Sequence, residues 1–383
     1  MARMVLNETS YFGAGCRAEL KTELSKRGMK KAFVVSDKDL VKFKVAKMVT
    51  DVLDEAGVKY CLFDDVKANP TIANVQAALA QFKACAPDVI IAIGGGSVID
   101  TAKAVGIIAN NPDFADVKSL EGTADTKNKS FPVMAFATTS GTAAEVTINY
   151  VITDEEAGRK LVCVDPNDIP LVAFNDAEMM MSMPKGLTAS TGMDALTHAI
   201  EGYITAGATP LSDLLCWNSI KFIADNLENA VKNGSDAAAR EGMAYGSYVA
   251  GMAFSNVGLG IVHSMAHPLG ARFDIAHGVA NALLLPYVME YNKDAAKAKY
   301  EGIARAMGVN TKGMSEDEAA DAAIAAVKKL ALAIGIPQHL RDIGIKEESL
   351  QQLAEDAFID PCTGGNPKKT SVAEILEIYK KAY

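Results

Sequence analysis

Short apolar runs alternate with helical patterns along the first half of the chain. The runs at residues 31–36, 60–63, 89–93 and 133–137 are rich in β-branched or aromatic residues and are bounded by polar residues or glycine, which predicts short buried strands. Between them, residues 40–55, 72–84 and 99–108 carry apolar side chains at helical spacing, which predicts helices. Strands that alternate with helices in this way form a parallel sheet covered on both faces. We also expect a hairpin at residues 147–153 and 160–164 and a further buried strand at 171–174.

From about Pro184 onward the strand patterns stop. Apolar positions at helical spacing, many of them alanine or leucine, predict helices at residues 186–204, 211–227, 237–254, 279–291, 316–333 and 372–383. We therefore predict an α/β domain with a Rossmann-like parallel sheet at residues 1–184 and an all-helical domain at residues 185–383. Residues 4–8 could add an edge strand, which would allow pairing across a homodimer.

Composition and charge narrow the range of partners. The 383 residues carry a net charge of −9 and no run of lysine or arginine, so nucleic acid and membrane surfaces, which both require a basic footprint, are not expected partners. The start of the chain turns polar too early for a signal peptide, and no apolar stretch approaches the roughly 20 residues of a membrane helix. Six scattered cysteines without a CxxC pair predict reduced thiols in a cytoplasmic protein: Cys16, Cys61, Cys85, Cys163, Cys216 and Cys362.

A glycine-rich loop follows the predicted strand at residues 89–93. Gly94, Gly95, Gly96 and Ser97 lead directly into a predicted helix, so the first free N–H groups of that helix would face an anion such as a pyrophosphate. The alternative is a tight turn in which Ser97 caps the helix and Asp100 approximates the partner of a capping box. The loop is not GxGxxG and follows the third strand, so the usual dinucleotide fingerprint is absent.

Further polar loops are predicted at the same edge of the sheet. The strand at residues 133–137 ends in Thr138-Thr139-Ser140-Gly141-Thr142, and ligands gather at the carboxyl ends of parallel strands. Asp37, after the first strand, could accept hydrogen bonds from a ribose and favour NAD over NADP, or could simply cap a helix. Asn69 follows the second strand. These loops predict a dinucleotide site, although each also fits an ordinary turn.

The helical half contains a candidate metal site. Asp194 and His198 are spaced i, i+4, and so are His263 and His267, while His277 follows closely. This spacing places each pair on one helix face, and a buried aspartate requires a partner. Oxygen and imidazole donors without a nearby cysteine suit Fe²⁺ or Zn²⁺. The residue types alone leave open which three or four of the five groups bind the metal.

Several segments together resemble the iron-containing alcohol dehydrogenase family over essentially the whole chain. The resemblance is carried by residues 176–201, 260–270 and 277–278, by the loop at 94–100 and by residues 138–142. Residues 142–150 and 360–367 resemble the branch of the family that acts on lactaldehyde and 1,2-propanediol. The resemblance implies an architecture similar to that of dehydroquinate synthase. Ala276 stands where family members commonly have proline, so the loop before His277 could be less stiff.

The resemblance also implies roles for individual residues. The metal ligands would be Asp194, His198, His263 and His277, with His267 beside them as a proton-relay group. NAD contacts are implied at Asp37, Asn69, Gly95, Gly96, Ser97, Asp100, Thr138, Thr139, Thr142 and Lys160. The substrate would contact Asn149, Val151, Phe254 and Cys362, of which the last three would otherwise be assigned to core packing.

The expected reaction is the NAD-dependent interconversion of short-chain aldehydes and alcohols or diols. The metal, iron or zinc, would lower the pKa of the alcohol, and hydride would pass to the nicotinamide. Family members that act on 1,3-propanediol, butanol or glycerol are the nearest alternatives. A dehydroquinate-synthase-like lyase is more remote, because such an enzyme should surround its phosphate-bearing substrate with basic residues and the metal segments carry only Lys185 and Arg272. A protein that binds metal without catalysis would not need the cofactor loops.

Overall fold

The computed structural model describes residues 3–383, and these divide into two compact units. The first comprises residues 3–139 and 143–182, and we call it the α/β unit. The second comprises residues 140–142 and 183–383, and we call it the helical unit. The parallel sheet of the first and the helices of the second confirm the predicted fold class.

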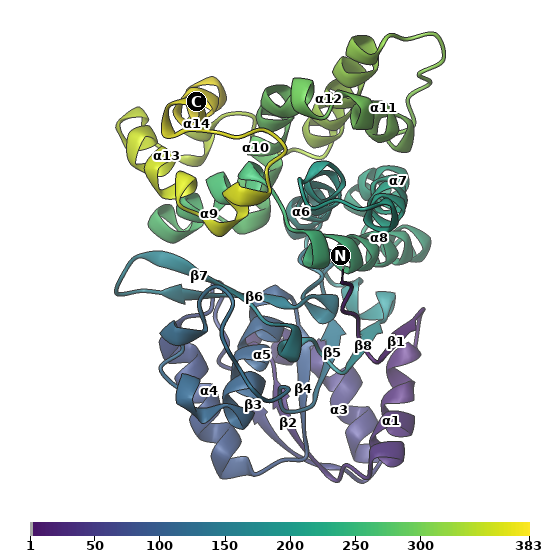
Figure 1. Ribbon diagram of the computed structural model, residues 1–383. Helices are drawn as coiled ribbons and strands as arrows, with labels where there is room; N and C mark the ends of the chain where they lie inside the picture. The colour runs from purple at the N-terminus through teal and green to yellow at the C-terminus, as the bar shows by residue number, and fades with distance from the viewer. Residues whose placement is uncertain (1–2) are drawn as a thin grey trace. The chain divides into compact units, whose positions relative to one another are not determined.

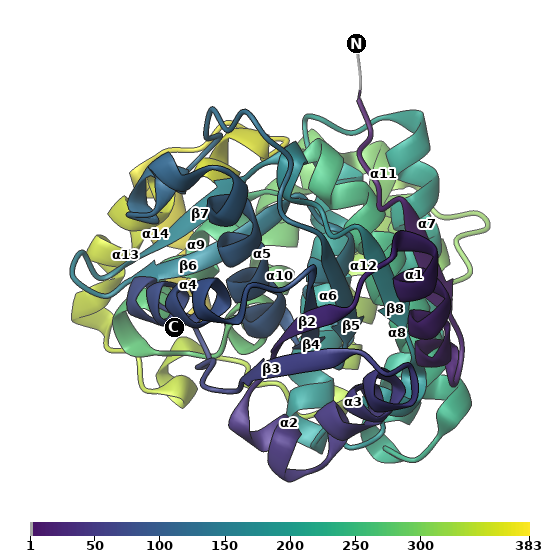
Figure 2. The same ribbon diagram turned by 90° about the horizontal axis from the view of Figure 1, so that it is seen from below.

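The α/β unit is built on a six-stranded parallel sheet in the order β1-β8-β5-β4-β2-β3. Figure 2 shows β3, β2 and β4 side by side at one end of this sheet. A separate antiparallel hairpin, β6 with β7, matches the predicted hairpin. The strands are β1 (Thr9–Phe12), β2 (Lys31–Val35), β3 (Lys59–Phe63), β4 (Val89–Gly94), β5 (Val133–Ala137), β6 (Asn149–Asp154), β7 (Arg159–Val164) and β8 (Val172–Asn175).

Helices cover both faces of the sheet, as Figure 1 shows, with α1 and α3 on one side and α4 and α5 on the other. Alternate residues of β2 and β4 enter opposite cores: Val34 and Ile91 pack with the α1 and α3 side, whereas Phe33 and Ile90 pack with the α4 and α5 side. This alternation explains why the strands are apolar along their full length. The helices are α1 (Leu20–Arg27), α2 (Lys38–Lys42), α3 (Val45–Glu55), α4 (Ile72–Cys85) and α5 (Gly96–Asn110).

Three expectations for this unit are wrong. The helix predicted at residues 40–55 is two helices, because Lys44 adopts a left-handed backbone conformation with φ of 63° between α2 and α3. Residues 4–8 form no strand, and the edge strand is β1, which pairs with β8. Cys61 on β3 and Cys85 at the end of α4 are joined by a disulfide, since the fold brings their Cα atoms to 6.2 Å, so these two cysteines are not free thiols.

The helical unit contains nine α-helices among the described residues. Six correspond to predicted helices, whereas α9, α11 and α13 were not predicted. Their bounds are α6 (Lys185–Ile204), α7 (Pro210–Lys232), α8 (Ala237–Val257), α9 (Ile261–Phe273), α10 (His277–Asn292), α11 (Lys297–Ala306), α12 (Glu316–Ala333), α13 (Leu350–Phe358) and α14 (Val372–Ala382). Within residues 3–383 no single helix meets the length and hydropathy of a membrane span, and the one pair that does so jointly, α8 with α9, is bent by 102°.

Candidate metal centre and cofactor loops

Four of the five predicted metal-site side chains converge in the helical unit. Asp194 and His198 come from α6, His263 from α9, and His277 from the first position of α10; one potential ligand atom from each lies within 4.8 Å of the others. The Asp194 Oδ1 atom is 4.0 Å from Nε2 of His263 and 3.6 Å from Nε2 of His277. Asp194, His198 and His263 are buried, and His277 is half-buried. The fifth residue, His267, belongs to a neighbouring cluster.

The electrostatics of the cluster suit a divalent cation. Burial lowers the pKa of His198 and lowers that of His263 well below its ordinary value, which keeps the imidazoles neutral, as metal ligation requires. Among the described residues, no lysine or arginine forms an ion pair with Asp194. A buried carboxylate among neutral imidazoles needs positive charge from another source. The donor set therefore fits Fe²⁺ or Zn²⁺.

Asn281 joins this cluster, although sequence reasoning missed it. Its Nδ2 donates to Asp194 Oδ1 at 2.7 Å and lies 3.2 Å from His263 Nε2 and 3.1 Å from His277 Nε2. The carboxylate only accepts, which fixes the orientation of the amide. Asn281 lies four residues after His277 on α10, so helical spacing from a candidate ligand could have identified it.

Glu201 is a second residue that sequence reasoning left without a role. Its Oε2 lies 2.5 Å from Nδ1 of His263, and its Oε1 accepts from the backbone N–H of Val262 at 2.7 Å. Burial raises the pKa of Glu201 to about 8. Glu201 lies seven residues after Asp194 and three after His198, so it shares a face of α6 with both.

His267 forms a separate cluster with Asp360 and Cys362. Its Nδ1 lies 2.7 Å from Asp360 Oδ2, and Asp360 Oδ1 accepts from the backbone N–H of Cys362 at 2.9 Å. Burial opposes ionisation of Asp360, but its contact with His267 lowers the pKa of this carboxyl below its ordinary value. The ring of His267 stacks on that of His277, with centroids 5.5 Å apart, so the two clusters are in contact. Asp360 follows α13, and no local sequence pattern points to its role.

Two predicted substrate residues of the helical unit lie beside these histidines. The ring of Phe254 stacks on His198 with centroids 4.1 Å apart. Cys362 is adjacent to Asp360 in the His267 cluster, and burial raises the pKa of its thiol well above the ordinary value. A raised thiol pKa keeps Cys362 protonated, which fits a packing side chain rather than a metal ligand.

In the α/β unit the glycine loop joins β4 to α5 as predicted, but the capping box is wrong. Gly95, not Ser97, is the N-cap, because α5 begins at Gly96 and places Ser97 in its first turn. The Oδ2 atom of Asp100 accepts from the backbone N–H of Val151 on β6 at 3.0 Å, and burial raises the pKa of Asp100 to about 6. A Cβ atom on Gly95 would lie 3.0 Å from Oγ1 of Thr139. The structure thus brings Gly95 and Thr139 together at the carboxyl ends of neighbouring strands.

The other predicted cofactor residues are spread over several loops. Asp37 caps α2 by accepting from Leu40 N–H at 2.8 Å. Lys160 Nζ donates to Asn69 Oδ1 at 2.7 Å. Thr138 directly follows β5, whereas Thr142 belongs to the short segment that groups with the helical unit.

A buried lysine that sequence reasoning missed anchors the strand that carries Asn149 and Val151. Lys103 Nζ donates to the carbonyl oxygens of Thr147 at 2.7 Å and Asn149 at 2.9 Å. The Oδ1 atom of Asn149 is buried and has no hydrogen-bond partner among the described residues. A buried acceptor without a partner is uncommon in a folded protein, which makes Asn149 available to a ligand.

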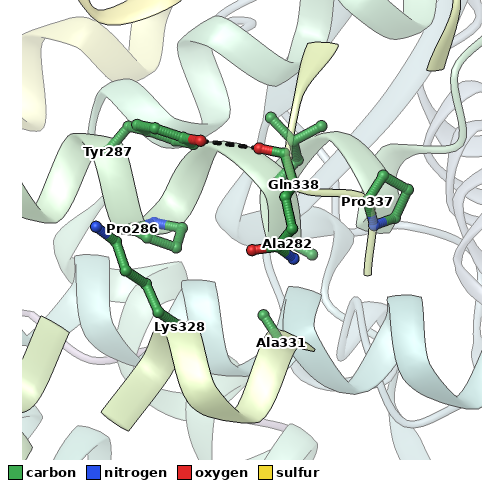
Figure 3. A pocket seen from close by; sticks show the side chains of 8 residues that line it. Ala282, Pro286, Tyr287, Lys328, Ala331, Pro337 and Gln338 are labelled. Carbon is green, nitrogen blue, oxygen red and sulfur yellow. Dashed lines mark hydrogen bonds between the residues drawn. The ribbon is translucent and has the colours of Figure 1, made fainter. Parts of the chain in front are cut away.

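Figure 3 shows a small pocket of the helical unit formed by α10, α12 and residues 337–338. The hydroxyl of Tyr287 donates to the carbonyl oxygen of Gln338 at 2.8 Å across it. No histidine or carboxylate lines this pocket, so it lacks the donors found at the metal cluster. Its lining residues are Ala282, Leu283, Pro286, Tyr287, Lys328, Ala331, Pro337 and Gln338.

Comparison with known proteins adds an independent finding. Residues 7–177 match the family described as iron-containing alcohol dehydrogenase, and residues 188–383 match the C-terminal part of the same family. The chain is 55% identical to lactaldehyde reductase of Escherichia coli K12 over 381 residues, which cover 100% of this chain and 99% of the relative. A 1,3-propanediol oxidoreductase structure matches with a TM-score of 0.97 and 42% identity, covering 100% of both chains. The structure of sulfoacetaldehyde reductase from Bifidobacterium kashiwanohense in complex with NAD+ matches with a TM-score of 0.87 and 30% identity, covering 100% of this chain and 98% of that one.

Proposed function

Because the chain belongs to the iron-containing alcohol dehydrogenase family, we propose that it interconverts lactaldehyde and 1,2-propanediol. As a member of this family it is an alcohol dehydrogenase that uses iron and NAD. The choice of substrate is supported by the full-length identity of 55% to a lactaldehyde reductase. The observation that carries the catalytic part of the proposal is the convergence of Asp194, His198, His263 and His277.

We propose these four residues as the metal ligands. When bound, iron supplies Lewis acidity toward the oxygen of the alcohol or aldehyde, and NAD accepts or donates the hydride. The metal-site residues of this chain contribute three imidazoles and one carboxylate, and all of them except His277 are buried. In such an environment, the attraction between a cation and the oxygen that becomes negative is stronger than in bulk solvent.

The residues proposed to hold NAD come from the loops of the α/β unit and from residue 142. The backbone N–H groups of Gly95, Gly96 and Ser97 at the start of α5 would bind the pyrophosphate. A side chain at residue 95 would crowd Thr139, because its Cβ atom would lie 3.0 Å from Thr139 Oγ1. The remaining proposed contacts are Asp37, Asn69, Asp100, Thr138, Thr139, Thr142 and Lys160.

His267 is proposed as the group that exchanges a proton with the substrate oxygen. Its Nδ1 faces the carboxylate of Asp360, so Nε2 remains for the substrate or for a water molecule. Asn149, Val151, Phe254 and Cys362 are proposed to contact the substrate. The unpartnered Oδ1 of Asn149 would accept a hydrogen bond from a substrate hydroxyl.

The proposal extends to the organisation of the protein. We propose an α/β domain at residues 1–184 and a helical domain at residues 185–383, and a cytoplasmic enzyme that forms a homodimer. The position of β1 at the sheet edge, with β8 as its neighbour, favours strand pairing between two copies. The net charge of −9 disfavours nucleic acid and anionic membranes as partners.

The test is NADH oxidation with lactaldehyde or glycolaldehyde by protein stripped of metal and reloaded anaerobically with Fe²⁺ or Zn²⁺. We expect turnover that appears with Fe²⁺, disappears with chelator and is lost in Asp194→Asn. Faster oxidation of 1,3-propanediol, butanol or glycerol than of 1,2-propanediol would replace the substrate assignment but retain the enzyme class. Absence of NADH turnover with either metal and all of these substrates would refute the proposal and favour a lyase without net redox chemistry.

A further inference from the structure

The carboxylate of Glu201 contacts the candidate metal site from the side opposite to the ligand atoms. Its Oε2 lies 2.5 Å from Nδ1 of His263, whose Nε2 faces Asp194 and Asn281. Glu201 is itself buried. Glu201 therefore contacts Nδ1 of His263, the ring nitrogen that is left when Nε2 binds a metal.

The same carboxylate also binds the start of α9, the helix that carries His263. The Oε1 atom of Glu201 accepts from Val262 N–H at 2.7 Å, while Oδ1 of Asn366 accepts from Ile261 N–H at 3.4 Å. Gly260, the N-cap, supplies no capping side chain. A Cβ atom there would lie 2.9 Å from Glu201 Oε1 and 3.0 Å from Asn366 Oδ1. Because residue 260 has no side chain, Glu201 and Asn366 can approach the start of α9 and accept hydrogen bonds from its first N–H groups, as an N-cap side chain otherwise would.

Donors reach both oxygens of Glu201, and this requirement selects a carboxyl group. The N–H of Val262 can only donate. The Oε2 atom of Glu201 lies 2.5 Å from Nδ1 of His263, so a proton on Nδ1 can be donated to it, which leaves Nε2 unprotonated and facing Asp194 and Asn281. A glutamine at position 201 has one acceptor oxygen and could accept at only one of these two positions.

We propose that Glu201 is a positioning residue of the metal site, which holds His263 in the tautomer that presents an unprotonated Nε2 to the metal. This inference rests on the proposed function, because it takes His263 as a ligand. An outer carboxylate that binds the second nitrogen of a ligand histidine fixes the orientation of the ring and makes it a better donor. Glu201 does so from the same helix that carries Asp194 and His198.

The test compares Zn²⁺ affinity of the metal-free wild type and of Glu201→Gln by competition with a chromophoric chelator. We expect about 10-fold to 100-fold weaker binding in the variant. Nitrogen-15 NMR of the imidazoles provides a second readout that a purely structural role would not change: His263 should carry its proton on Nδ1 in the wild type and should populate the Nε2–H tautomer in Glu201→Gln. Glu201→Asp, which keeps a carboxylate but withdraws it by one methylene, should lose less affinity and replaces the glutamine variant if that variant does not fold.

Asn366→Ala is the matched control, because Asn366 caps the same helix without contacting a histidine. It should lower the thermal midpoint of metal-free protein but change Zn²⁺ affinity less than about threefold. Wild-type affinity in both Glu201 variants, or an equal loss in Asn366→Ala, would overturn the inference. Failure of the wild type to bind Zn²⁺ or Fe²⁺ would instead refute the proposed metal site.

Discussion

Replacement of Glu145 by glutamine should stabilise the α/β unit at alkaline pH and leave it unchanged at acidic pH. Glu145 follows the loop at residues 138–142 and is only 3% exposed. Burial raises the pKa of its carboxyl to about 7, although the nearby ammonium group of Lys103 acts in the opposite direction. No lysine or arginine of the described residues forms an ion pair with it. The buried environment of Glu145 in the folded protein therefore favours the neutral form of its carboxyl group.

The sign and size of the effect follow from the pKa. A carboxyl whose pKa rises from 4.5 to about 7 on folding binds its proton more tightly in the folded state. Its stabilising contribution is complete below pH 4.5 and is lost as the pH rises through 7. The difference of about 2.5 pKa units, at 1.36 kcal/mol each, amounts to about 3 kcal/mol by pH 8. Glutamine does not titrate, so the variant should avoid this loss.

The assay is urea unfolding of metal-free protein between pH 4.5 and 8. The single tryptophan, Trp217, lies on α7 in the helical unit, so a transition seen by circular dichroism but not by tryptophan fluorescence belongs to the α/β unit. Glu348→Gln, at a surface carboxylate whose side chain is 79% exposed, is the control and should show no such pH dependence. The reasoning from burial is refuted if the stability of Glu145→Gln relative to wild type is no greater at pH 8 than at pH 4.5.

Three further predictions concern the site and its loops. His267→Ala should lower kcat by at least about 100-fold while metal content, measured by atomic emission, stays at the wild-type value; loss of metal would make His267 a ligand. Gly95→Ala should weaken NAD binding about tenfold in calorimetry, because the new Cβ meets Thr139 Oγ1 at 3.0 Å; Thr139→Ala in addition should recover part of the loss. Ala276→Pro should raise stability by about 0.4–1 kcal/mol in thermal unfolding, because residue 276 has φ of −58°, which suits proline; destabilisation would mean that the loop before α10 requires a conformation that proline cannot adopt.

The sequence predicted most of the fold, because the central strands and the long helices bury regular faces. The four helices it did not predict, α1, α9, α11 and α13, are short or lack a one-sided pattern. The helix that carries His263 is the clearest case, since the nine residues from Ile261 to Leu269 are all buried and Pro268 lies within it. A helix buried on all sides has no polar face to reveal its period.

Local sequence patterns could identify some residues of the candidate site but not others. The proposed ligands stand out in the sequence because Asp194 with His198, and His263 with His267, form i, i+4 pairs and His277 follows closely. Glu201 and Asn281 share helix faces with the proposed ligands, so helical spacing from those residues could have identified them once the ligands were in hand. Asp360 reaches His267 from 93 positions away in the chain. Tertiary packing creates that contact, and no local pattern can encode it.

The placement of charge in α6 links the fold to the metal. This helix carries Asp194, His198 and Glu201, all buried, among alanine, leucine and isoleucine side chains. The buried carboxylate of Asp194 weakens a metal-free core, because an ionised group in an apolar interior costs free energy unless it is compensated, whereas burial favours the neutral form of Glu201. A divalent cation supplies that compensation, and at 100 times its dissociation constant it stabilises the folded state by about 2.7 kcal/mol. Helix α6 thus carries a buried carboxylate together with two of the four proposed ligands, which is the pattern expected when stability near a site has been exchanged for binding.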